Sequence, residues 1–355
     1  MTEFVQDGMR PYLDWQFEYP PLAIVPIALG GAFGNDEVTY PVVFGLLMLA
    51  CLLALQRWVG ELGGRAAAWA CVPAPLLLGA MIRTHYDLLP AAIVAGALLL
   101  FARGRTTWAF AALGLGTVVK LTPIMLVPIA VLWLWGRGER DRILPGVAAC
   151  AAVIVAVCAP FWGDGFLEQF RFHLDRPVQI ESTAATVLSV IGDSYVTGTE
   201  ERPDPYKSNG LAGGPADAVQ ALFTVALGLV YLALLVLARR GGDVRRLTLL
   251  ALATTVAFIA LGKVLSPQYL VWLLPFAALA WAWGDRAIAL LCAAAALVTQ
   301  LEFPSRYFDV VEQQAFATAL VGVRNLLLLA LLGVTVATVA GSGRSPSPAA
   351  APRSG

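Results

Sequence analysis

Long apolar runs recur from one end of the chain to the other and limit the folds it can adopt. A membrane-spanning helix needs about 20 predominantly apolar residues. The first full span is 38–58, and later apolar runs lie at 66–82, 88–102, 106–119, 121–135, 143–160, 217–238, 247–262, 268–283, 286–301 and 314–340. With 59% hydrophobic and 14% charged residues and a mean hydropathy of +0.73, the chain has more apolar surface than a soluble core buries. We predict an all-α, polytopic transmembrane helix bundle of about eleven spans.

Arginines occupy every second connection between these runs, which the positive-inside rule assigns to the cytoplasm. The other connections then face outward, including the long segments 1–19 and 161–216. We expect one transmembrane domain over 1–340, in which the Pro/Gly-rich stretch 197–216 is a mobile loop. Residues 341–355 are of low complexity and predict a disordered cytoplasmic tail.

Charge and motif content exclude several classes of protein. A net charge of zero leaves no basic face for a nucleic acid. The five cysteines all lie within apolar runs without metal-ligand spacing, so we expect buried thiols. The sequence has no nucleotide-binding glycine fingerprint, no phosphate-binding loop and no histidine/cysteine metal set.

Two outward segments concentrate ionisable residues beside apolar runs. Arg83, His85 and Asp87 fall within five residues between two runs, and charges so close to hydrocarbon indicate a functional site. The alternative is a self-satisfied salt bridge in an outer loop. Asp14 and Glu18 precede a Pro-Pro pair where the chain enters the membrane, although a solvated loop would explain them equally well.

Lys120 interrupts the apolar stretch 106–135, which has arginines on both flanks and therefore must cross the membrane twice. Lys120 is then at the outward apex of a hairpin, either in a site or as an unpaired, snorkelling cation. Further candidates lie in the long outward loop and before the run 268–283, although polar residues at helix starts are often only caps. They are Arg176, Gln179, Glu181, Lys263 and Gln268.

The ordered series GMRPYLDWQFEYPPLA, RTHYDLLPA, KLTP, RPVQIEST and LSPQYLVWLLP, between residues 8 and 283, resembles glycosyltransferase family 87 of the GT-C superfamily. These are polyprenyl-phosphate-mannose-dependent membrane mannosyltransferases. The resemblance implies a helix bundle in the cell membrane, an extracytoplasmic active site and a lipid-linked donor that enters laterally. Such families usually begin with a further helix, so the resemblance leads us to expect that the first family helix is missing from this sequence.

The residues permit inverting transfer of a sugar, mannose by the resemblance, from a polyprenyl-phosphate donor to a glycolipid or glycan acceptor. Asp14 or Glu18 would be the general base, and cations would stabilise the phosphate leaving group, namely Arg83, Lys120, Arg176 and Lys263. His85 would orient Asp87, and sugar hydroxyls would bind to Asp87, Gln179, Glu181 and Gln268. No cofactor is required, and a divalent cation remains an alternative. The rival functions are a lipid or solute transporter or flippase, and a truncated, inactive relic.

Overall fold

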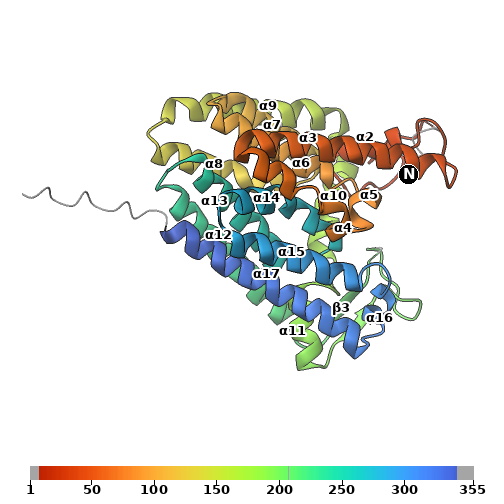
Figure 1. Ribbon diagram of the computed structural model, residues 1–355. Helices are drawn as coiled ribbons and strands as arrows, with labels where there is room; N and C mark the ends of the chain where they lie inside the picture. Colours follow the sequence, from red (N-terminus) through yellow and green to blue (C-terminus); the bar gives the residue numbers. More distant parts are fainter. Residues whose placement is uncertain (1–7, 207, 342–355) are drawn as a thin grey trace, which may run out of the picture.

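Helices run back and forth between two ends of the molecule in the computed structural model, which describes residues 8–206 and 208–341 (Figure 1). We call the end that carries the segment 161–216 the loop end, at the right of Figure 1, and the opposite end the tail end. Of the predicted tail 341–355, Gly341 closes the last helix, and the remainder lies outside the described residues.

The element order is helical almost throughout. The α-helices are α2 (Ile24–Gly30), α3 (Thr39–Ala70), α4 (Ala74–Leu78), α5 (Met81–Thr84), α6 (Leu88–Ala102), α7 (Thr106–Val119), α8 (Leu126–Gly136), α9 (Ile143–Cys158), α10 (Asp164–Asp175), α11 (Thr183–Ile191), α12 (Ala216–Ala238), α13 (Val244–Leu261), α14 (Leu274–Ala282), α15 (Arg286–Glu302), α16 (Tyr307–Val311) and α17 (Ala315–Gly341). The 3-10 helices are η1 (Pro21–Ala23), η2 (Thr122–Met125), η3 (Arg140–Arg142), η4 (Ala159–Phe161) and η5 (Pro267–Leu273). The strands are β1 (Val178–Gln179), β2 (Tyr195–Thr197) and β3 (Gly210–Ala212).

Each predicted apolar run falls on a helix or on two consecutive helical segments, with one exception. The run 66–82 is not a single span, because turns around Pro73 and Gly79 divide it into the end of α3, α4 and α5. Gly79 has φ +52°, a conformation that glycine adopts without steric cost. Within residues 8–206 and 208–341, five helical segments are long and apolar enough to cross a membrane, namely Thr39–Ala70, Arg140–Phe161, Ala216–Ala238, Val244–Leu261 and Ala315–Gly341.

Helix α13 lies at the centre of the bundle, since 78% of its residues are buried. It packs against α12 and α17 and also touches α6 and α8. A second layer is formed where α3 packs against α6 and α14, and α7 packs between α6 and α9. Leu250, Ala253, Val256 and Ala257 of α13 are wholly buried, so the core surrounds this helix.

The segment 161–216 folds over the loop end. β3 is the central strand of a small antiparallel sheet between β1 and β2. Thr197 and residues 210–212 of the stretch 197–216, which the sequence predicts to be a mobile loop, therefore belong to this sheet. Leu167, Phe170 and Leu174 of α10 are exposed on one side of that helix, as in an amphipathic helix that lies at a membrane surface.

Arginines gather at the tail end, where they join neighbouring helices. Arg103 contacts Glu61 of α3, and Arg245 of α13 binds both oxygens of Asp285 at 2.8 and 2.9 Å. Arg137 donates to the Gly242 carbonyl at 2.7 Å. The connections predicted to share one side of the membrane therefore lie together in space.

Candidate active site

A buried ion pair at the loop end joins the residue that precedes α6 to the residue that follows α7. Asp87 directly precedes α6, and Lys120 adopts an extended conformation that ends α7. Because α6 packs against α7, the Lys120 Nζ lies 2.7 Å from the Asp87 Oδ1. Asp87 is 1% exposed and Lys120 is 8% exposed, so water screens this pair very little.

Four aromatic rings enclose the Lys120 ammonium group. Its Nζ lies 4.9 Å from the centroid of Tyr86, and within 5.8 Å of Trp272, Tyr269 and Tyr19. Tyr269 and Trp272 of η5 are stacked with centroids 4.2 Å apart. The Trp272 Nε1 also donates to the Asp87 Oδ1 at 2.7 Å. Desolvated cation–π contacts are worth up to about 2 kcal/mol, so these rings hold the ammonium group in one place.

A cavity of about 430 Å³ opens beside this cage. Its polar lining includes the side chains of Lys120, Lys263, His173 and Thr122, and the rings of Tyr19, Tyr269 and Trp272. The remaining walls are largely apolar, and three of the apolar side chains, Ile124, Phe170 and Leu174, are at least 39% exposed. The cavity therefore combines ammonium groups inside with an apolar rim at the protein surface.

A second lysine, Lys263, lines the cavity together with Lys120. The Lys263 Nζ donates to the Leu174 carbonyl at 2.7 Å, and burial followed by repulsion from Arg176 lowers the pKa of Lys263. Arg176 does not line the cavity; it is 8% exposed and contacts Ser208. Within the described residues its Nε has no hydrogen-bond partner. An anion in the cavity would therefore meet the two lysines.

The two first-loop carboxylates occupy different positions. Asp14 is exposed in a turn closed by Arg10, whose backbone N–H donates to its Oδ2 at 2.7 Å and holds its pKa below the usual value. Glu18 is half-buried, and its carbonyl accepts a 3.0 Å hydrogen bond from the Nε2 of His173, a residue that lines the cavity. Burial lowers the pKa of His173, which favours its neutral form. Glu18 thus lies on a segment that contacts the cavity wall, whereas Asp14 has no such contact.

The other predicted site residues lie apart from the ion pair or beside it. Arg83 is exposed on α5, and the His85 Nδ1 lies 3.0 Å from the Thr84 Oγ1. In the described part of the chain, neither Arg83 nor His85 forms a hydrogen bond or an ion pair with Asp87 or Lys120. Gln179 and Glu181 are buried and hydrogen-bonded to each other at 2.8 Å. Gln268 is half-buried on η5. The substrate-binding roles of these residues remain predictions.

Comparison with known proteins bears on this site. The sequence profile of Glycosyltransferase family 87 matches residues 17–267. The chain belongs to glycosyltransferase family 87. This confirms the family predicted from the motif series and makes the protein a membrane glycosyltransferase of GT-C type.

The chain is also similar to a solved structure. ArnT from Cupriavidus metallidurans, in the apo state, is similar with a TM-score of 0.49 and 17% sequence identity, over 96% of this chain and 71% of that chain. No curated protein matches significantly.

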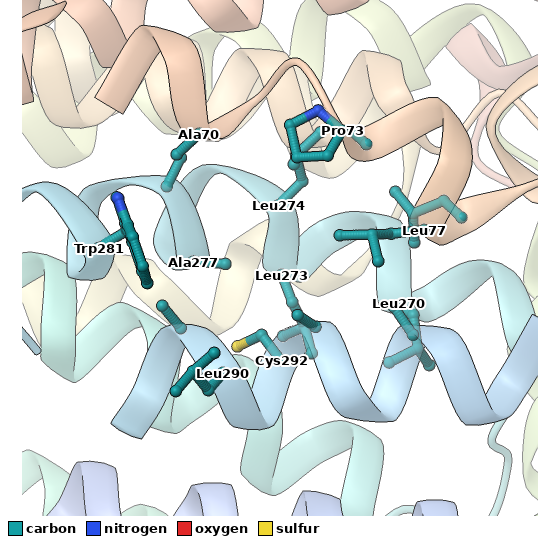
Figure 2. A pocket seen from close by; sticks show the side chains of 16 residues that line it. Ala70, Pro73, Leu77, Leu270, Leu273, Leu274, Ala277, Trp281, Leu290 and Cys292 are labelled. Atoms are coloured by element: carbon teal, nitrogen blue, oxygen red, sulfur yellow. The ribbon is translucent and has the colours of Figure 1, made fainter. Parts of the chain in front are cut away.

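A second pocket of this glycosyltransferase lies on the opposite face of η5 (Figure 2). It has a volume of about 250 Å³ and is lined by apolar side chains of α3, α4, α14 and α15. Leu270 and Leu273 of η5 face this pocket, whereas Tyr269 and Trp272 face the cavity beside Lys120. The apolar pocket has no charged lining and cannot perform acid–base chemistry, so the candidate site is the other cavity.

Sequence reasoning did not select the aromatic cage as part of the site. Tyr19, Tyr86, Tyr269 and Trp272 each lie within a quoted motif, but tyrosine and tryptophan beside apolar runs are common at membrane interfaces. His173 was missed because a single histidine in a loop carries no spacing signal. Within the described part of the chain, no group of three His, Cys, Asp or Glu side chains could hold a metal ion.

Proposed function

We propose that this glycosyltransferase moves a hexose, mannose by its family resemblance, from a polyprenyl-phosphate donor to a glycolipid or glycan acceptor with inversion. The observation that supports it is the cavity beside Lys120, which combines two lysines with an apolar rim. The phosphate of the donor would bind to the lysines. Its polyprenyl chain would extend out of the cavity past Ile124, Phe170 and Leu174. A nucleotide sugar has no hydrocarbon chain for that rim.

The proposed chemistry follows from the charges. The acceptor hydroxyl attacks the anomeric carbon, and the bond from that carbon to the donor phosphate oxygen breaks. Lys120 and Lys263, which line the cavity, would stabilise the negative charge on the departing phosphate, and Arg176 would act at longer range, since such interactions are strong where water is excluded. No divalent cation is needed for this step, because the leaving group carries a single phosphate.

Glu18 is the better candidate for the general base. It would take the proton of the attacking hydroxyl, a role typically worth 10²- to 10⁴-fold in rate. Its neighbour Tyr19 and its hydrogen-bond partner His173 both line the cavity. Asp14 is exposed and held by Arg10. Asp87 would hold Lys120 in place by the 2.7 Å ion pair.

The test is sugar transfer by the purified protein in lipid vesicles. We expect radiolabelled mannose to pass from polyprenyl-phosphate mannose to a glycolipid acceptor, and Glu18→Gln to lower the rate at least about 100-fold. Asp14→Asn is the matched control and should retain most activity. Transfer from a nucleotide sugar alone, in lipid-free detergent, would overturn the donor assignment, and full activity in Glu18→Gln would overturn the base.

A further inference from the structure

Arg324 is the largest fully buried side chain among the described residues, and it lies within the membrane helix α17. An arginine in such a helix is costly unless it is paired. Its Nη1 lies 3.4 Å from the Glu181 Oε1 and 3.9 Å from the Glu302 Oε2, and its Nη2 contacts the Glu181 carbonyl. Helix α17 lies beyond residues 17–267, which match the family profile.

The hydrogen bonds continue from Arg324 to the cavity wall. The Gln179 Nε2 donates to the Glu181 Oε2 at 2.8 Å. The backbone N–H of Gln179 donates to the Lys263 carbonyl at 3.1 Å, and its Oε1 accepts from the Leu265 N–H at 3.4 Å. Lys263 in turn lines the cavity and donates to the Leu174 carbonyl. Two residues, Glu181 and Gln179, therefore connect Arg324 to Lys263, a cation of the site.

Arg324 itself does not line the cavity, so it cannot touch the donor. Asn325 supports the same contact, because its Nδ2 donates to the Glu181 carbonyl at 3.2 Å and to the Thr186 Oγ1 at 2.7 Å. Two neighbouring side chains of α17 thus hold Glu181 in place from one side. Gln179, which is hydrogen-bonded to Glu181, in turn contacts the backbone of Lys263 and Leu265. A salt bridge needed only for folding would not have to connect with the cavity wall.

We propose that Arg324 is a positioning residue that sets the place of the Lys263 ammonium group through Glu181 and Gln179. The inference rests on the proposed function for its effect on catalysis, since Lys263 would there face the donor phosphate. Its structural consequence, a change in the surroundings of Lys263, does not depend on the donor.

The experiment compares Arg324→Lys with Arg246→Lys in the full-length protein. Lysine keeps the charge but loses the planar fork that contacts Glu181 at two points. Arg246 is a matched control, since it is also buried, lies on α13 and donates to the Val339 and Leu237 carbonyls near the tail end. The first readout is the rate at which an amine-reactive reagent modifies Lys263, followed by mass spectrometry.

We expect Arg324→Lys to raise the Lys263 modification rate at least about threefold and Arg246→Lys to leave it unchanged. We also expect kcat/KM for polyprenyl-phosphate mannose to fall about tenfold, because Lys263 would stabilise the departing phosphate, and to fall no further when Arg324→Lys is added to Lys263→Met. Glu181→Gln should reproduce both effects and is the substitute variant if Arg324→Lys does not fold. An unchanged Lys263 modification rate in both variants, or additive effects on kcat/KM, would overturn the inference. A wild-type protein that does not use this donor would refute only the proposed function.

Discussion

Lys120 and Asp87 show how much the meaning of one residue depends on its partner. One of the two interpretations that the sequence allows is that Lys120 is an unpaired, snorkelling cation. That interpretation is wrong, because the Lys120 Nζ lies 2.7 Å from a carboxylate that is itself 1% exposed. Removing one partner of a buried pair leaves the other charge uncompensated, at a cost of about 3–5 kcal/mol.

We therefore predict that Lys120→Met lowers the thermal unfolding temperature and abolishes transfer. The double variant Lys120→Met with Asp87→Asn should recover most of the stability without any activity, because both buried charges are then gone. Lys120→Arg should fold but lose at least about tenfold in rate, or 1.4 kcal/mol, since a planar guanidinium does not fit a cage built around a compact ammonium group. Activity in the double variant would show that the pair serves folding alone.

The residues of this pair could be selected from the sequence, but their contacts could not. Arg83, His85 and Asp87 are neighbours in the chain, which favoured a joint role. The extended conformation of His85 separates them, so that Arg83 is exposed while Asp87 is buried. The partners of Asp87 are 33 and 185 positions away in the chain, and only the packing of α6, α7 and η5 brings them together.

Among the elements, η5 has the most direct influence on the site. It separates the cavity beside Lys120 from the apolar pocket, and its successive residues face one or the other. The apolar run 268–283 was predicted from composition. The 3-10 geometry of its first turns, which places Tyr269 and Trp272 on the same side, follows from Pro267 and from packing that composition does not reveal.

We predict that Trp272→Phe lowers the transfer rate at least about fivefold, roughly 1 kcal/mol, while the protein still folds. Phenylalanine keeps an aromatic ring beside Lys120 but removes the N–H that donates to Asp87. Trp281→Phe is the matched control, because Trp281 lines the apolar pocket on the other side of η5 and α14. The comparison requires initial rates and unfolding temperatures for both variants. Equal rates would show that this hydrogen bond does not influence the reaction.

At the scale of the whole molecule, the two ends differ in chemistry. The tail end gathers arginines that join helix ends, as between Arg245 and Asp285. The loop end carries the cavity, the cage and the segment 161–216. Functional polar groups confined to one end favour an enzyme over a transporter, whose binding groups are expected near the midplane. The positive-inside rule then predicts that the tail end is cytoplasmic.

The last prediction tests this orientation in intact cells. In a chain whose five native cysteines are replaced by alanine, Pro205→Cys should react with a membrane-impermeant maleimide from outside, because Pro205 is exposed at the loop end. Asp141→Cys, exposed at the tail end, is the control and should react only after permeabilisation. The reversed pattern would place the cavity on the cytoplasmic side, where nucleotide sugars are available. A lipid-linked donor would then lose its main advantage, which is delivery of the sugar to a compartment without nucleotides.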